Sequence, residues 1–204
     1  VTYIMVGLFV GLMGYFGYFL QVQSETVINN SYNARLDSFS DRIIRGEILS
    51  NDGTVLAKTN VAEDGTEVRE YPYGSLFAHV VGYSDQGKTG LESLANFYLL
   101  SSHMNLVEQA VNELSDAKNL GDQVVTTLDV GLQQAASDAL GDRRGAVVVM
   151  EPDTGKILAM VSKPGFDPNQ LSSQWESLIS GDNTEAQLLN RAAQGVYPPG
   201  STFK

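Results

Sequence analysis

The chain has 204 residues, a formal net charge of −11 and no cysteine. The lack of cysteine excludes a disulfide framework and a thiolate metal site. The acidic balance argues against nucleic-acid binding, which requires a basic face, and it suits a soluble domain.

The first 20 residues form an almost wholly apolar segment, and the first charged residue is Glu25. The segment is long enough to cross a bilayer as one helix. It is too long for the apolar part of a signal peptide, and no Ala-x-Ala-like cleavage site follows it, so we expect an uncleaved anchor over residues 1–22. Because the chain begins with Val rather than Met, we expect further residues upstream, and the positive-inside rule cannot be applied.

Residues 23–120 predict a polar stalk and then a small mixed α/β domain, near the lower end of typical domain sizes. Two runs of strand-forming residues flank Asn51-Asp52-Gly53, which indicates a hairpin. In chain order, we expect a helical stalk at 23–40, hairpin strands at 43–49 and 54–58, a strand at 67–71, and helices at 91–100 and 104–118.

Residues 121–204 predict a second folded unit that begins at Gly121-Asp122. A strand at 124–128 leads to Asp129, a residue type that caps helix N-termini. The helix that follows is expected to bury one apolar face, made of Leu132, Ala135, Ala136, Ala139 and Leu140. In chain order, we then expect strands at 146–151 and 156–162, and helices at 171–180 and 184–192.

The last eight residues, Tyr197-Pro198-Pro199-Gly200-Ser201-Thr202-Phe203-Lys204, place a serine and a lysine at SxxK spacing after a Pro-Pro-Gly turn. Residues three apart on a helix are neighbours on one face, so we expect Lys204 one turn above Ser201. A serine hydroxyl is a weak nucleophile until a base takes its proton, and a desolvated lysine can be that base. The spacing therefore predicts Ser201 as a nucleophile and Lys204 as its general base.

This string, preceded by Asn190-Arg191-Ala192, resembles the acylation motif of class B penicillin-binding proteins, the D,D-transpeptidases that cross-link peptidoglycan. The resemblance covers nearly the whole chain. Three boxes of the family's pedestal domain have matches: the first at residues 45–49, 52–53 and 56–57, the second at 69–72 and 78–83, and the third at 90–92. The opening of the transpeptidase domain matches residues 127–129 and 145–151. In the first box the family has Asp-Arg where this chain has Ser50-Asn51, which puts any ion pair of that arginine in doubt.

The resemblance implies an α+β fold: a transmembrane helix at 1–22, a stalk and pedestal (dimerisation-type) domain at 23–120, and the start of a serine β-lactamase-like transpeptidase domain at 121–204. It implies that Ser201 is acylated by D-Ala-D-Ala stem peptides and by β-lactams, that Lys204 is the base, and that no cofactor or metal takes part.

The resemblance also implies a partner and a location. The implied partner is a SEDS-type glycosyltransferase, and the implied location is the bacterial cell membrane, with one span and extracytoplasmic domains. The family's SxN and KTG motifs follow the serine, so we expect them beyond residue 204, and we expect this chain alone not to form a stable acyl-enzyme.

Other matches to these motifs are interpreted as coincidences. Ser31-Tyr32-Asn33 spells SxN and Lys88-Thr89-Gly90 spells KTG, but both precede Ser201. Ser115-Asp116-Ala117-Lys118 is a second SxxK at the end of an amphipathic pattern, which is typical of a solvated helix end. His79 lies inside a pedestal box and is interpreted as structural.

Two other classes of function remain open. Residues 82–89 match the phosphate-loop pattern G-x-x-x-x-G-K-[ST] of nucleotide-binding proteins, between an apolar run and an expected helix. That match is local, whereas the transpeptidase resemblance runs along the chain in order. The remaining class is a non-catalytic interaction module built from the anchor and the pedestal.

Overall fold

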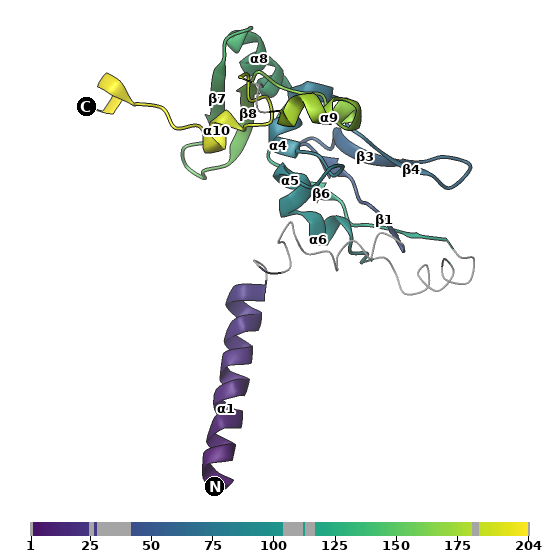
Figure 1. The fold of residues 1–204 in the computed structure, drawn as a ribbon, viewed down its shortest axis with the longest axis vertical. Coiled ribbons are helices and arrows are strands. Elements are labelled where there is room, and N and C mark those ends of the chain that lie inside the picture. Colours follow the sequence, from purple (N-terminus) through teal and green to yellow (C-terminus); the bar gives the residue numbers. More distant parts are fainter. Residues whose placement is uncertain are drawn as a thin grey trace.

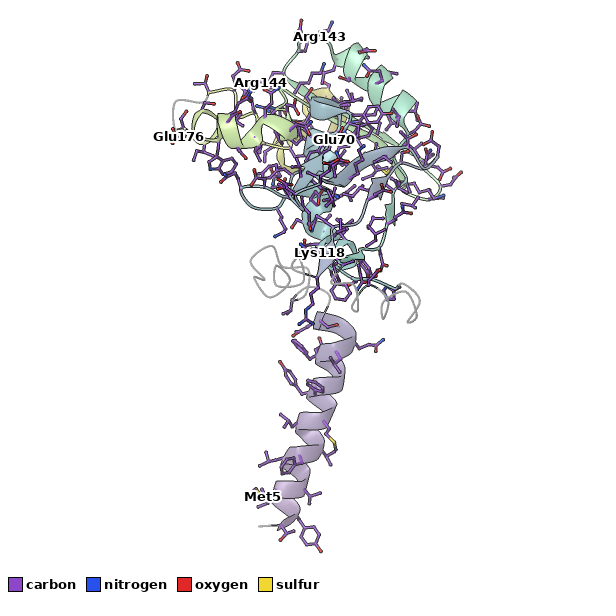
Figure 2. All side chains as sticks on the ribbon, turned by 90° about the vertical axis from the view of Figure 1, so that its right-hand side faces the viewer. Met5, Glu70, Lys118, Arg143, Arg144 and Glu176 are labelled. Carbon is purple, nitrogen blue, oxygen red and sulfur yellow. The ribbon has the colours of Figure 1, made fainter. Side chains whose placement is uncertain are left out.

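The computed structural model describes residues 2–24, 27, 42–103, 112, 117–180 and 184–203. Its first element is the helix α1 (Thr2–Tyr18), which continues into the π-helical turn η1 (Phe19–Gln23). Together they form one helix of 22 residues, long and apolar enough to cross a membrane and 0% buried. Figure 1 shows this helix as a rod, and Figure 2 shows side chains such as Met5 projecting from it. The expected helix is confirmed, and its insertion in a membrane stays a prediction.

Two small sheets organise the residues that follow. In the larger sheet the strand order is β4-β3-β2-β6, with β2 at Ile48–Leu49, β3 at Val55–Val61, β4 at Glu67–Glu70 and β6 at Val124–Val125. In the smaller sheet β1 (Ile43–Ile44) pairs in parallel with β5 (Asn119–Leu120). The hairpin is confirmed, because β2 and β3 are antiparallel and Gly53 takes the left-handed φ of 86° that their turn requires. The expected domain boundary after residue 120 stays a prediction, and β6, just beyond it, pairs with β2.

Short helices pack beside the larger sheet: η2 (Gly74–Leu76), α4 (Ala78–Val81), α5 (Gly90–Leu94) and α6 (Asn96–Leu99). The single helix expected at 91–100 is instead α5 and α6, because Ala95 leaves helical geometry with φ −97° and ψ 10°. Phe77, Leu56 and Leu99 are the centre of the core that these elements share. The helix expected at 104–118 and most of the stalk at 23–40 lie outside the described residues.

The second unit is a helix and a hairpin followed by short helices. Its elements are α8 (Val130–Leu140), β7 (Gly145–Met150), β8 (Ile157–Lys163), η3 (Pro168–Gln170), α9 (Leu171–Ile179), α10 (Arg191–Gln194) and η4 (Gly200–Phe203). The antiparallel β7–β8 pair and helix α9 confirm the expected hairpin and the helix at 171–180. The helix expected at 184–192 is wrong, because only Arg191 and Ala192, the first two residues of α10, are helical in that stretch.

The buried face of α8 also differs from the expected one. Asp129 caps the helix as predicted, and its side chain accepts from the Leu132 N–H. The buried residues, however, are Gln133 and Ala136, while Leu132 is 38% exposed. Gln133 is buried because its amide donates to Leu76 O at 2.8 Å and to Met160 O at 2.9 Å, so polar partners outweigh the apolar periodicity.

The two units pack against each other. A second core joins Ala78 and Tyr83 of the first unit to Phe166, Leu171 and Leu178 of the second. At the same joint, the Asn169 side chain accepts from Tyr71 N and donates to Tyr71 O, both at 2.9 Å. In Figure 1, α4 and α9 meet at this joint between the β7–β8 hairpin and the β3–β4 hairpin.

Candidate active site

The predicted nucleophile lies in a short 3₁₀ helix at the end of the described chain. Ser201 is exposed within η4, which Gly200 opens with a left-handed φ of 55°. Thr202 donates from its hydroxyl and from its N–H to Pro199 O, which closes the turn. Lys204 lies outside the described residues, so its place beside Ser201 stays a prediction. Figure 1 shows this stretch, in yellow, extending away from the β7–β8 hairpin.

The segment that leads to Ser201 is held to β8 by side chains. The Ser162 hydroxyl donates to Leu189 O at 3.1 Å and accepts from Arg191 N at 3.0 Å. Arg191 is 3% exposed, and its guanidinium donates to the backbone oxygens of Glu185 and Ala186. These contacts satisfy carbonyls that a helix would satisfy internally, which explains why an irregular backbone replaces the expected helix.

His79 contacts the same segment from the first unit. Its Nε2 lies 2.7 Å from Gln187 O, and its own carbonyl accepts from the Asn190 amide at 3.2 Å. Burial lowers the pKa of His79 and so favours the neutral ring. The Asn190 side chain also caps α10 by accepting from Ala192 N and Ala193 N.

Residues from all three matched pedestal boxes meet around one carboxylate. Glu92 is 0% exposed and accepts from Arg45 Nε at 2.6 Å and from Arg69 Nε at 2.8 Å. Arg45 also donates to the Asn96 side chain, and Tyr71 donates to Glu92 at 3.3 Å. Burial and the Glu92 carboxylate raise the pKa of Tyr71 to about 12, so the phenol stays protonated. The cluster ties the residue that follows β1 to β4 and α5.

Ser50, at the position where the family has an acidic residue, makes local bonds. It is 0% exposed, donates to Asp52 Oδ1 and accepts from Thr54 N at 2.9 Å. The Ser50 and Thr54 bonds lower the pKa of Asp52 to about 2. Asn51 follows Ser50, and its N–H donates to Leu128 O, so the turn of the first box is held by hydrogen bonds.

The phosphate-loop match at 82–89 lacks the context that such a loop needs. The helix α4, rather than a strand, precedes it, and Thr89 N donates to Tyr83 O at 3.1 Å, which closes the loop on itself. A Cβ at Gly82 would lie 2.0 Å from Thr89 O, so the two ends of the loop are in contact. Lys88 instead lines an open cavity of about 300 Å³ with Arg45 and Arg69.

Of the coincidental motifs, the structure describes only part. Lys88-Thr89-Gly90 opens α5, whereas Ser31-Tyr32-Asn33 and Ser115 lie outside the described residues. Lys118, the lysine of the second SxxK, forms an ion pair with Glu67 at 2.6 Å. Within the described ranges, no group of three His, Cys, Asp or Glu side chains could hold a metal ion.

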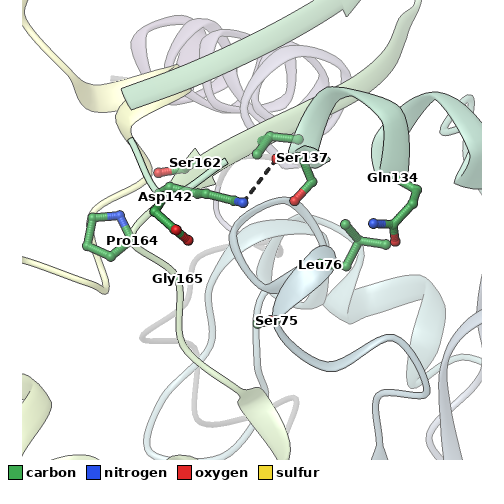
Figure 3. A pocket seen from close by; sticks show the side chains of 10 residues that line it. Ser75, Leu76, Gln134, Ser137, Asp142, Ser162, Pro164 and Gly165 are labelled. Atoms are coloured by element: carbon green, nitrogen blue, oxygen red, sulfur yellow. Dashed lines mark hydrogen bonds between the residues drawn. The ribbon is translucent and has the colours of Figure 1, made fainter. Parts of the chain in front are cut away.

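A cavity of about 440 Å³ lies between the two units. Figure 3 shows it between Ser75 and Leu76 on one side and Ser137, Ser162 and Pro164 on the other. Lys163 donates here to Ser137 O at 3.0 Å and to Gly141 O at 2.7 Å. Because this ammonium group binds the carbonyls at the C-terminal end of α8, its role is that of a helix cap.

Comparisons with known proteins match both units. Residues 45–124 match the penicillin binding protein A dimerisation domain, and residues 145–204 match the penicillin binding protein transpeptidase domain. The peptidoglycan D,D-transpeptidase PbpA of Mycolicibacterium smegmatis is 39% identical over 187 residues, covering 83% of this chain and 37% of that protein. The peptidoglycan D,D-transpeptidase MrdA of Escherichia coli is 34% identical over 176 residues, covering 69% of this chain and 28% of that protein.

Solved structures give the same result. The imipenem acyl-enzyme complex of penicillin-binding protein A from M. tuberculosis has a TM-score of 0.69 at 34% identity, over 81% of this chain and 41% of that one. The D,D-transpeptidase domain of a peptidoglycan glycosyltransferase from Eggerthella lenta has a TM-score of 0.66 at 42% identity, over 79% of this chain and 35% of that one. The chain thus spans 37% of the length of the Mycolicibacterium protein and 28% of the Escherichia coli protein. The chain, matched over residues 45–124 and 145–204, belongs to the class B penicillin-binding protein family.

Proposed function

We propose that the full-length protein is a peptidoglycan D,D-transpeptidase in which Ser201 is the nucleophile and Lys204 the general base. The observation that carries this proposal is the SxxK string inside residues 145–204, the stretch that matches the transpeptidase domain. The peptidoglycan D,D-transpeptidases PbpA and MrdA that the chain resembles support it, and so does the similar imipenem acyl-enzyme complex of penicillin-binding protein A from M. tuberculosis.

The proposed reaction has two acyl transfers. Ser201 Oγ attacks the carbonyl of the penultimate D-Ala of a stem peptide, and Lys204 takes the hydroxyl proton. Lys204 then gives that proton to the peptide nitrogen as the C–N bond breaks, so the terminal D-Ala leaves with a free amine. The amine of a second stem peptide then attacks the ester, and the serine recovers its proton as the cross-link is released. The Ser201 N–H would stabilise the oxyanion together with a donor from the strand that carries KTG in the family. β-Lactams would acylate the same oxygen.

The proposal includes a location and a partner. Helix α1 with η1 would anchor the protein in the bacterial cell membrane, with both folded units on the extracytoplasmic side, where peptidoglycan lies. The 22-residue apolar helix at Thr2–Gln23 supports the anchor. A SEDS-type glycosyltransferase that supplies the glycan strands would be the partner, in contact with the anchor and the pedestal.

Labelling of the full-length protein with fluorescent penicillin tests the nucleophile and the base. We expect Ser201→Ala to abolish labelling, and Lys204→Met to slow it by about 10²–10⁴-fold, the usual contribution of general-base catalysis. Ser115→Ala and Lys118→Met, which alter the second SxxK, are the matched controls and should label like the wild type. Covalent labelling that survives Ser201→Ala but disappears in Ser115→Ala would refute the assignment.

A further inference from the structure

We propose that His79, which belongs to the pedestal, is a positioning residue for the acylation of Ser201. It would hold residues 185–191, the segment that leads into the nucleophile, in a fixed place against the pedestal. This inference rests on the proposed transpeptidase function. It goes beyond the motif residues, because His79 lies within the dimerisation-domain match at 45–124 while the segment it holds lies within the transpeptidase match at 145–204.

Two hydrogen bonds connect His79 to the segment, and they run in opposite directions. The carbonyl of Gln187 can only accept, so the His79 Nε2 at 2.7 Å must carry its proton and donate. In return, the amide of Asn190 donates to the His79 carbonyl at 3.2 Å. His79 is 8% exposed, and Phe166 packs edge-on against its ring with centroids 5.3 Å apart, so the ring orientation is fixed. A buried bond of this kind is expensive to break, because one partner would be left unsatisfied.

The segment needs side chains from outside because its backbone is irregular. Ala186 takes a left-handed φ of 44°, and side chains bond to the carbonyls of residues 185, 186, 187 and 189. Ser162 and Arg191, which satisfy three of these carbonyls, both belong to the second unit. His79 reaches the segment from the pedestal by hydrogen bonds, and Leu188 of the segment packs against the core that includes Ala78 and Tyr83, so the segment is tied to the pedestal.

The segment sets the direction in which the chain leaves toward Ser201. Asn190, which bonds to His79, also caps α10, and η4 follows shortly after that helix. A shift of Asn190 would therefore rotate α10 and move the Pro-Pro-Gly turn. Displacement of a catalytic group by about 1 Å can cost about 10²-fold in rate, so a loosened segment should slow acylation while leaving the chemistry of Ser201 and Lys204 intact.

A pair of substitutions at residue 79 tests the role in the full-length protein. Glutamine places its Nε2 at nearly the reach of the histidine Nε2, so His79→Gln keeps the donor, whereas His79→Leu fills similar space without one. We measure the maximal rate constant of acylation by fluorescent penicillin and the penicillin concentration that gives half of it. His79→Leu should lower the rate constant by about 10-fold or more without raising the half-saturating concentration, and His79→Gln should recover most of the loss. His103→Leu, at the other histidine of the chain, is the matched control and should behave like the wild type.

If the His79→Leu variant does not fold, Asn190→Asp tests the same inference. It keeps the oxygen that caps α10 and removes the amide donor to His79 O, so the same fall in the rate constant is expected. Wild-type rate constants in both His79→Leu and Asn190→Asp would overturn the inference, and so would a loss in His79→Gln equal to that in His79→Leu. If labelling instead survives Ser201→Ala, the proposed nucleophile itself is wrong, which separates that failure from failure of the positioning role.

Discussion

At the scale of single residues, Glu92 is a fully buried carboxylate that forms ion pairs with two arginines. One carboxylate, 0% exposed, faces the guanidinium groups of Arg45 and Arg69, which are 11% and 9% exposed. Arg69 Nη2 is buried and has no hydrogen-bond partner. The Glu92 carboxylate therefore supplies the negative charge that offsets the desolvation of both guanidinium groups. A buried charge left without its partner is far more costly than an exposed one.

Glu92→Gln should therefore destabilise the protein by about 3–5 kcal/mol, the usual cost of removing one partner of a buried ion pair. Urea unfolding of the detergent-solubilised protein, followed by tryptophan fluorescence of Trp175, measures the change. The matched control is Glu70→Gln, because Glu70 pairs with Lys58 at 3.3 Å on the surface and its side chain is 41% exposed. That control should cost less than about 1 kcal/mol. Equal losses in the two variants would contradict the central role of Glu92.

The sequence indicated which residues of this cluster belong to the matched boxes, but it did not predict how they contact one another. Arg45, Arg69 and Glu92 each lay in a stretch that resembles a pedestal box. That they share one carboxylate could not be predicted from spacing, because Arg45 and Glu92 are 47 positions apart and only the tertiary fold brings them together. For Ser201 and Lys204 the pattern names the residues and their roles, and their geometry stays a prediction, since Lys204 lies outside the described residues.

At the scale of elements, the cap of α8 gives a direct test. Asp129 accepts from Leu132 N at 2.8 Å and so satisfies one of the free N–H groups at the start of the helix. Asp129→Ala should lower the free energy of unfolding by about 1 kcal/mol, within the usual range of about 0.5–2 kcal/mol. The same urea titration measures it.

Asp138→Ala is the matched control for this cap. Asp138 lies on the same helix, where its carboxylate accepts from the exposed Gln134 amide at 2.8 Å. A surface change of this kind should stay within about 0.5 kcal/mol. If Asp138→Ala costs as much as Asp129→Ala, the capping bond is not the source of the effect.

Local signals predicted some elements and failed for others, for identifiable reasons. The hairpins formed by β2 and β3 and by β7 and β8 were predicted because strand-forming runs flank residues that favour turns. The helix expected at 184–192 failed because Arg191 and Ser162 capture the carbonyls of the segment, so tertiary contacts outweigh helix propensity. The buried face of α8 was predicted wrongly because apolar periodicity takes no account of a buried polar side chain. Gln133 is such a side chain, and its amide donates to Leu76 O and Met160 O.

At the scale of the whole molecule, the two matched domains are joined by polar side chains as well as by a shared core. Gln133 bridges from α8 to Leu76 O, Asn169 pairs with the backbone of Tyr71, and His79 holds Gln187. These partners are 57, 98 and 108 positions apart, so no local pattern could have predicted them. The joint makes the pedestal a support for the segment that leads to Ser201.

The last prediction concerns the function of the molecule as a whole and separates a transpeptidase from a nucleotide-binding protein. A phosphate loop needs a strand before it and an open array of N–H groups, whereas Gly82–Thr89 follows the helix α4 and is closed by the bond from Thr89 N to Tyr83 O. We therefore expect isothermal titration of the full-length protein with Mg-ATP to give no binding heat. Lys88→Ala should leave penicillin acylation unchanged, as should the exposed control Lys156→Ala. Micromolar Mg-ATP binding that Lys88→Ala abolishes and Lys156→Ala preserves would instead make this loop a nucleotide site, because only a lysine that contacts phosphate would be required for it.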